Sequence, residues 1–233
     1  MGIPKPDGVP VRSYRTEFEL EEDPISEGGM WLNGKADGVD WIDVISAGDH
    51  CYGAYSRNSA AEKRAEQGNL NEAEVAAPEG DYDDPTAVLT GEWGPDQYAR
   101  GVVFCQNPTT DYFQEVQLRF RYVLSASWCA GYEVIYRCLT GEDAYVEIVR
   151  WNGKIGDWTS MARIVGEGRG VKDGDVVEAT MLGNVITGYI NGVEILSVSD
   201  DAFSSGAPGI GFNFGVGHTN VDHGFKSFEV DSW

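Results

Sequence analysis

Charged and polar side chains recur at every second position of one stretch of the chain, residues 115–122. The polar members are Glu115, Gln117, Arg119 and Arg121, and the apolar ones between them are Val116, Leu118, Phe120 and Tyr122. Because successive side chains of a β-strand point to opposite faces, this alternation predicts one polar and one apolar face. A polar sheet face can bind a polar ligand, and it can equally be a solvated surface with cross-strand ion pairs.

The next two predicted strands extend the polar face. Glu133 and Arg137 share a face of the strand over residues 131–138, and either Glu147 or Arg150 can join them from residues 145–151. On a bent sheet this face would form a groove for a glycan. Arginines in it could neutralise a uronate, and Glu133 or a nearby tyrosine could act as the base of a lyase. If the protein is an enzyme, its predicted catalytic residues are therefore Glu133, Arg119 and Arg137.

Tryptophan supplies a second kind of candidate contact, because the face of an aromatic ring packs on the apolar C–H face of a pyranose. Trp151 and Trp158 flank a predicted turn, so we expect them to be partly exposed, whereas the other tryptophans suit core or hairpin packing. The predicted carbohydrate-binding set comprises Arg119, Arg121, Glu133, Arg137, Trp151 and Trp158.

Other chemistries find less support. A retaining glucanase needs two carboxyl groups about 5 Å apart on one face, and no Glu-x-Asp-x-x-Glu motif is present. Asp81, Asp83, Asp84 and Asp222 could bind a structural Ca²⁺, although they lack EF-hand spacing and also suit a solvated acidic loop. The three histidines have no metal-ligand spacing, and the sequence shows no nucleophile elbow.

The four cysteines are Cys51, Cys105, Cys129 and Cys138, and they include no CxxC pair. If Cys129 and Cys138 share a strand, they lie roughly 30 Å apart, which is too far for a bridge. Any disulfide must therefore link different strands. The alternative is four mostly buried free thiols.

The elements that position these residues are predicted to be strands. About eleven short runs with strand character follow one another from Thr86 to Val230, separated by Gly- and Asn-containing turns, with no convincing helix between them. The turn Ile190-Asn-Gly-Val is the strongest hairpin signal. Another strand is expected over Tyr14–Leu20. Residues 59–77 change to Ala, Glu and Gln and predict a short helical or mobile insertion.

Composition sets the limits of organisation and partners. The 233 residues suit one β-sandwich domain over residues 14–233, preceded by an extended Pro- and Gly-rich arm over residues 1–13. A net charge of −21 argues against nucleic acid as a partner and against the anionic surfaces of membranes. No run of about 18 apolar residues predicts membrane insertion. The N-terminus lacks the features of a signal peptide, and an extracellular or virion-associated location is favoured over a cytoplasmic one.

One long stretch carries a family resemblance. Residues 171–200, with Asn191-Gly192 between two strands, and Gly206-Ala-Pro-Gly-Ile-Gly-Phe after them, resemble the final strands of laminin G-like and concanavalin A-like lectin/glucanase domains. Phe18 with Glu27–Trp31, and Gly224–Phe228, fit the first and last strands of that family. The resemblance implies an all-β, two-sheet antiparallel jelly-roll sandwich across nearly the whole chain.

The function that the resemblance implies is broad, because the family includes lectins, hydrolases, lyases, adhesion modules and virion proteins. We expect a non-catalytic carbohydrate-binding or adhesion module that recognises a polysaccharide on a sheet face or rim loops. A polysaccharide lyase or glycoside hydrolase on the same scaffold is the second hypothesis. The third is a structural or decoration protein of a larger assembly such as a virion, with protein partners.

Overall fold

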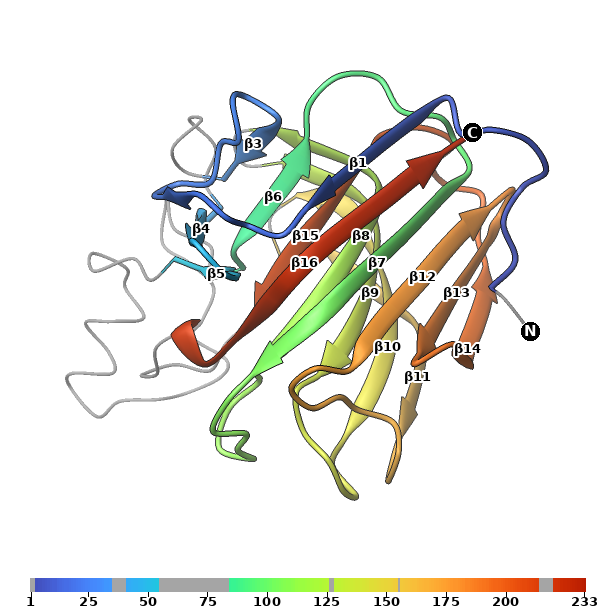
Figure 1. Cartoon of the computed structure of the whole chain (residues 1–233). Helices are drawn as coiled ribbons and strands as arrows, with labels where there is room; N and C mark the ends of the chain where they lie inside the picture. Colours follow the sequence, from blue (N-terminus) through green and yellow to red (C-terminus); the bar gives the residue numbers. More distant parts are fainter. Residues whose placement is uncertain (1–2, 35–40, 55–83, 126–127, 155, 214–219) are drawn as a thin grey trace.

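The computed structural model describes residues 3–34, 41–54, 84–125, 128–154, 156–213 and 220–233. The predicted insertion over residues 59–77 and the candidate ligands Asp81 and Asp83 lie outside these ranges. The described chain forms two antiparallel sheets that pack face to face (Figure 1). Its one helical element is the short 3₁₀ turn η2 (Asn220–Asp222), and no described helix is long and apolar enough to cross a membrane.

The nine-stranded sheet is built around β16, which lies between β7 on one side and β1 and β5 on the other (Figure 1). Its strands, in spatial order, are β14 (Val193–Ser199), β13 (Val185–Ile190), β12 (Val176–Leu182), β7 (Gln97–Cys105), β16 (His223–Ser232), β5 (Cys51–Gly53), β4 (Val44–Ala47) and β2 (Glu21–Glu22), with β1 (Arg12–Thr16) also on β16. Strands far apart in the sequence are therefore neighbours, as a jelly roll requires.

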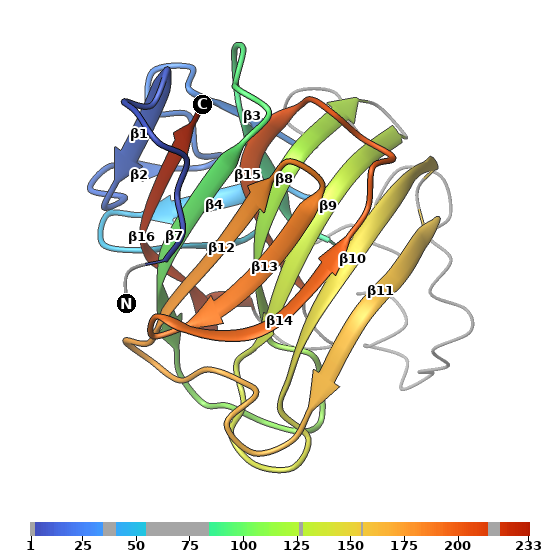
Figure 2. The same cartoon turned by 90° about the vertical axis from the view of Figure 1, so that its right-hand side faces the viewer.

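The seven-stranded sheet contains the three long strands in which the sequence predicts the polar face. Its order is β11 (Trp158–Val165), β10 (Tyr145–Lys154), β9 (Trp128–Arg137), β8 (Glu115–Ser125), β15 (Ala207–Asn213), β6 (Thr86–Leu89) and β3 (Trp31–Asn33). Figure 2 shows β12–β14 of the other sheet lying in front of β8–β11. The main core fills the space between the sheets, with Leu118, Phe120, Tyr136, Phe212 and Phe228 fully buried in it.

Local sequence explains where the strands end. Asn191 and Gly192 have φ angles of 50° and 76°, so the predicted hairpin between β13 and β14 turns through two left-handed residues. The strand predicted over Tyr14–Leu20 is wrong in its bounds. It spans Arg12–Thr16, because Phe18 takes a φ of 54° and turns the chain while its ring is buried in the core.

Five strand pairings contain a register shift, and three of these bulges bear on the polar face and the sheet edges. In β8 the register with β9 shifts between Phe120 and Val123, where Arg121 has a φ of 47°. One edge strand of each sheet, β11 and β14, is bulged as well. Met161 is an extra residue of β11 opposite Ile148 and Val149, and Ile195 is an extra residue of β14 opposite Gly188 and Tyr189. A bulge reverses the alternation of side chains beyond it.

Candidate functional site

The outer face of the seven-stranded sheet, which is turned away from the other sheet, carries most of the predicted site. The pairing register arranges its side chains in rows across the strands. One row contains Arg119 of β8, Glu133 of β9, Val149 of β10 and Ser160 of β11. The next row contains Gln117, Ile135, Glu147 and Arg163. The sequence prediction that Arg119 and Glu133 lie together is therefore met by the geometry.

Arg119 is the centre of a buried polar cluster. Its Nη1 lies 2.8 Å from Glu133 Oε2, and its Nη2 lies 3.1 Å from Asp84 Oδ2. The same guanidinium donates to Gln117 Oε1 at 2.8 Å and to the hydroxyl of Tyr122. Arg119 is 0% exposed and Glu133 is 2% exposed. Neighbouring side chains therefore exclude solvent from Arg119, and this part of the described face is not a solvated surface.

Burial governs the protonation of this cluster. It raises the pKa of Glu133 to about 7, although the positive charge of Arg119 opposes the shift. Burial also raises the pKa of Asp84, again against the pull of Arg119. For Arg119, burial would lower the pKa, but the charges of Glu133, Tyr122 and Asp84 together hold it above its ordinary value. The guanidinium stays charged, and the two carboxyl groups take up protons more readily than in water.

An aromatic layer covers one side of the cluster. Trp151 donates its Nε1 hydrogen to Glu133 Oε2 at 3.0 Å, and the ring of Trp41 meets the Trp151 ring edge-on with 5.0 Å between their centres. Trp151 is only 4% exposed, so the expectation that it is partly exposed is wrong. The physical reason is a second apolar cluster on the outer face. Its members are Trp41, Val88, Tyr122, Leu124, Cys129, Ile135, Tyr145, Val149 and Trp151.

The bulge in β8 separates Arg121 from the other arginines and corrects two predicted orientations. Tyr122, expected on the core face, lies on the outer face with Arg119 and Cys129. Arg121 instead donates to three backbone carbonyls, those of Pro95 at 2.8 Å, Phe203 at 2.9 Å and Gly183 at 2.6 Å. Burial lowers the pKa of Arg121. Its contacts join loops at one end of the sandwich.

Arg137 lies further along the same outer face, beside Glu115. The guanidinium donates to the carbonyl of Tyr112 at 2.8 Å and lies over the rings of Phe113 and Tyr145, at 4.7 Å and 5.5 Å from their centres. Glu115 accepts hydrogen bonds from the Tyr145 hydroxyl and from Asn213, and burial raises its pKa to about 8. Arg137 is 3% exposed and contributes to packing in this described face.

The edge strand β11 is the accessible part of the outer face. The outer-face side chains of β8, β9 and β10 described above are buried, whereas Trp158 is 50% exposed, as the sequence predicts. Ser160, Arg163 and Val165 are exposed on the same strand. We call these four residues the β11 platform. Sequence reasoning missed Ser160 and Arg163, because only the hairpin register pairs Arg163 with Glu147.

Arg163 is held in place by its neighbours on β10. Its Nη1 lies 3.1 Å from Glu147 Oε2, and its Cζ lies 3.8 Å above the centre of the Tyr145 ring. Its side chain nevertheless stays 44% exposed. The platform therefore combines an exposed aromatic ring and an oriented, accessible cation.

The predicted calcium ligands are not brought together in the described residues. Asp84 is engaged by Arg119, and Asp222 accepts a hydrogen bond from Asn107 Nδ2 at 3.4 Å. No group of three or more His, Cys, Asp and Glu side chains that could hold a metal ion occurs among them. The described donors thus do not fit a Ca²⁺ site.

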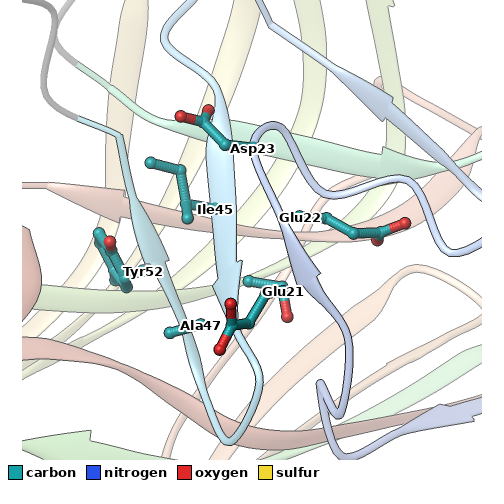
Figure 3. A pocket seen from close by; sticks show the side chains of 7 residues that line it. Glu21, Glu22, Asp23, Ile45, Ala47 and Tyr52 are labelled. Carbon is teal, nitrogen blue, oxygen red and sulfur yellow. The ribbon is translucent and has the colours of Figure 1, made fainter.

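A shallow hollow of about 380 Å³ lies on the nine-stranded sheet between β2, β4 and β5 (Figure 3). Its lining residues are Glu21, Glu22, Asp23, Ile45, Ser46, Ala47 and Tyr52. The Glu22 carboxylate accepts hydrogen bonds from the backbone amides of Ser26 and Glu27, and in Figure 3 it points away from Tyr52. The lining contains no cationic residue and no nucleophilic pair, so this hollow does not resemble a catalytic site.

No family model matches the chain, and no curated protein does. Solved structures do. The metal-free exoplasmic/lumenal domain of VIP36 is 10% identical, with 95% of this chain and 91% of that chain covered and a TM-score of 0.57. Carbohydrate-binding module CBM66 from Bacillus subtilis is 12% identical, with 90% and 100% covered and a TM-score of 0.54.

A prokaryotic β-1,3-1,4-glucanase (lichenase) derived from a mouse hindgut metagenome is 12% identical, with 95% and 99% of the two chains covered and a TM-score of 0.50. The fold is a concanavalin A-like jelly roll. This confirms the all-β, two-sheet jelly-roll architecture that the resemblance implies. At these identities, the concanavalin A-like likeness establishes the fold alone.

Proposed function

We propose that this protein binds a glycan on the β11 platform and does not cleave it. The observation that carries the proposal is the exposure of Trp158, Ser160 and Arg163 on the outer face of β11, beside described strands of the same sheet whose outer-face side chains are buried. The buried polar cluster around Arg119 and Glu133 then supports the sheet beside β11 and is not the binding surface.

The chemistry of the platform suits a neutral or mildly acidic glycan. The Trp158 ring can pack against the C–H face of one sugar ring, and the Arg163 guanidinium can donate to hydroxyl or carboxylate oxygens. The two positions pair with Trp151 and Glu147, four residues apart on β10, so they lie about 13 Å apart along the strand. That separation suits a short oligosaccharide rather than a single sugar.

The fold neighbours support a glycan role. One is named a carbohydrate-binding module, and VIP36 has also been solved in a Ca²⁺/Man3GlcNAc-bound form, which this chain matches with 10% identity and a TM-score of 0.55. Those names describe the neighbours, and on this chain the β11 platform is the surface that we propose for a glycan. The negative charge of the chain favours neutral glycans over polyanionic ones.

Glu133 supports one alternative function, a lyase or hydrolase. Its pKa near 7 and the adjacent Arg119 suit acid–base chemistry. Its oxygen, however, is already engaged by Arg119 and Trp151, and its side chain is 2% exposed. A catalytic group must reach its substrate, so the geometry favours binding.

The test is a glycan array at neutral pH, followed by calorimetry on any glycan that binds. Trp158→Ala should weaken binding about tenfold or more, because it removes the stacking ring. Trp128→Ala is the matched control. Trp128 is 44% exposed and lies on β9, which β10 separates from β11, so its removal should leave binding unchanged.

A reducing-sugar assay and the ultraviolet absorbance of unsaturated uronates separate binding from catalysis. Release of product that Glu133→Gln abolishes would support the enzyme and contradict the proposal. Equal losses in the Trp158→Ala and Trp128→Ala variants would exclude the β11 platform. Absence of binding across a broad array would favour the assembly-protein hypothesis.

A further inference from the structure

Two of the four cysteines lie in contact across the sandwich. Cys105 is the last residue of β7 in the nine-stranded sheet, and Cys138 directly follows the last residue of β9 in the seven-stranded sheet. The Cys105 thiol donates to the carbonyl oxygen of Cys138, with 3.8 Å between Sγ and O, so the two residues are in direct contact. Both are free cysteines in this structure, and both belong to the main core.

The two thiols differ in reactivity. The neighbouring Cys138 side chain lowers the pKa of Cys105, against the opposing effects of burial and of nearby aspartates. Burial, together with the neighbouring Cys105 side chain, raises the pKa of Cys138 well above its usual range. Cys105 is also the more accessible, at 6% exposure against 0% for Cys138. A more acidic attacking thiol beside a second thiol is the arrangement that thiol–disulfide exchange uses.

The other two cysteines lack this arrangement. Cys129 lies on the outer face, where the Tyr122 hydroxyl approaches its Sγ at 3.3 Å, and burial raises its pKa to about 12. Cys51 is fully buried in β5 opposite Phe225 of β16. Each of these two environments suits an inert buried thiol.

We propose that Cys105 and Cys138 are the site of a reversible disulfide that links the two sheets, formed by exchange with a neutral small-molecule disulfide. The Cys105 thiolate attacks one sulfur of the reagent and releases one molecule of its thiol, which leaves a mixed disulfide on Cys105. Cys138 then loses its proton, attacks the Cys105 sulfur and releases the second thiol. Two protein thiols are oxidised, and one reagent disulfide is reduced to two thiols.

Charge selects the reagent. Asp173 and Asp222 lie near Cys105, and the chain as a whole carries a net charge of −21. Anionic disulfides such as oxidised glutathione are therefore repelled, and a neutral one such as 2-hydroxyethyl disulfide should react faster.

The experiment incubates the folded protein with 2-hydroxyethyl disulfide, blocks remaining thiols with an alkylating reagent under denaturing conditions, and maps the linked peptides by mass spectrometry. The expected product joins Cys105 to Cys138 within one chain and leaves Cys51 and Cys129 alkylated. The linked residues are 33 positions apart. Closing a loop of that length should raise the midpoint of thermal unfolding by about 10 °C, and a dithiol reductant should reverse the rise.

Two variants serve as controls. The Cys51→Ala/Cys129→Ala double variant should keep both the linkage and the shift, whereas Cys105→Ala should lose both. If Cys105→Ala does not fold, the peptide map of the unsubstituted protein still decides. Four alkylated cysteines after prolonged exposure to the disulfide, a linkage that involves Cys51 or Cys129, or links only between chains would each overturn the proposal.

Discussion

At the scale of single residues, Arg119 depends on a glycine of the neighbouring strand. A Cβ atom on Gly211 of β15 would lie 2.3 Å from Arg119 Nη2 and 2.3 Å from Gln117 Oε1. The guanidinium cannot move aside easily, because Glu133 and Asp84 hold it from two directions. Gly211 thus leaves the space in which a buried cation and its carboxyl partners meet.

Gly211→Ala should therefore lower the free energy of unfolding by about 1–3 kcal/mol, the usual cost of overpacking. Denaturant unfolding measures this loss. In an Arg119→Met background the methyl group has more room, so the same substitution should cost less. An equal cost in both backgrounds would show that the strain at Gly211 does not come from Arg119.

The sequence predicts the sheet face of some side chains in β8 and β9 correctly and of others incorrectly. Alternation correctly places Arg119 and Glu133 on one face. It assigns Arg121 and Tyr122 to the wrong faces because a bulge reverses the period, and β-propensity carries no sign of that bulge. Two glycines do indicate the bulge. Cβ atoms on Gly131 and Gly206 would collide with the backbone at Arg121 and Tyr122, so only glycine fits beside it.

At the scale of elements, one edge strand of each sheet, β11 and β14, is bulged. A straight, exposed edge strand invites pairing with another chain, and a bulge interrupts the row of free backbone groups that such pairing needs. Met161 has this effect in β11, and Ile195 has it in β14. The β11 platform can thus expose Trp158 and Val165 on an edge strand that is poorly suited to strand addition.

Deleting Met161 should restore a continuous register with β10 and increase self-association relative to the unaltered protein. Light scattering over a concentration series measures the effect. Met161→Ala keeps the bulge while removing most of the side chain, so it should associate no more than the unaltered protein. Equal association of the deletion and the Ala variant would show that the bulge does not protect this edge.

Strand existence and hairpin turns were predictable for β7–β16, because periodicity and turn residues are local. The burial of the outer face was not. Periodicity distinguishes the polar side of a strand from the apolar side. Polar residues such as Glu115, Gln117 and Glu133 therefore predict a face that is exposed to solvent. Only tertiary contacts, such as that between Trp41 and Trp151, reveal that this polar side is covered.

At the scale of the whole molecule, buried ionisable groups should dominate the dependence of stability on pH. Burial raises the pKa of Glu115 from 4.5 to about 8, so the folded state binds this proton more tightly than the unfolded chain does. The resulting stabilisation is complete below pH 4.5 and is lost as the pH rises through about 8. His223 acts in the opposite direction, because burial lowers its pKa from 6.5 to about 4 and its effect is lost on acidification.

Glu115→Gln tests this assignment. The variant keeps an acceptor for the Tyr145 hydroxyl and removes the titration, so its unfolding midpoint should rise relative to that of the unaltered protein between pH 4.5 and about 8. Thermal unfolding across that range supplies the measurement. Parallel curves for the two proteins would mean that Glu115 titrates normally in the folded state.

The position of β16 determines when the sandwich can be completed during synthesis. This strand, the last of the sixteen that the described residues form, pairs with β7 on one side and with β1 and β5 on the other. Its partners therefore emerge from the ribosome long before it does and must wait with open edges. This strand closes the centre of the larger sheet, so a ribosome that stalls before residue 223 leaves that sheet in two unjoined parts.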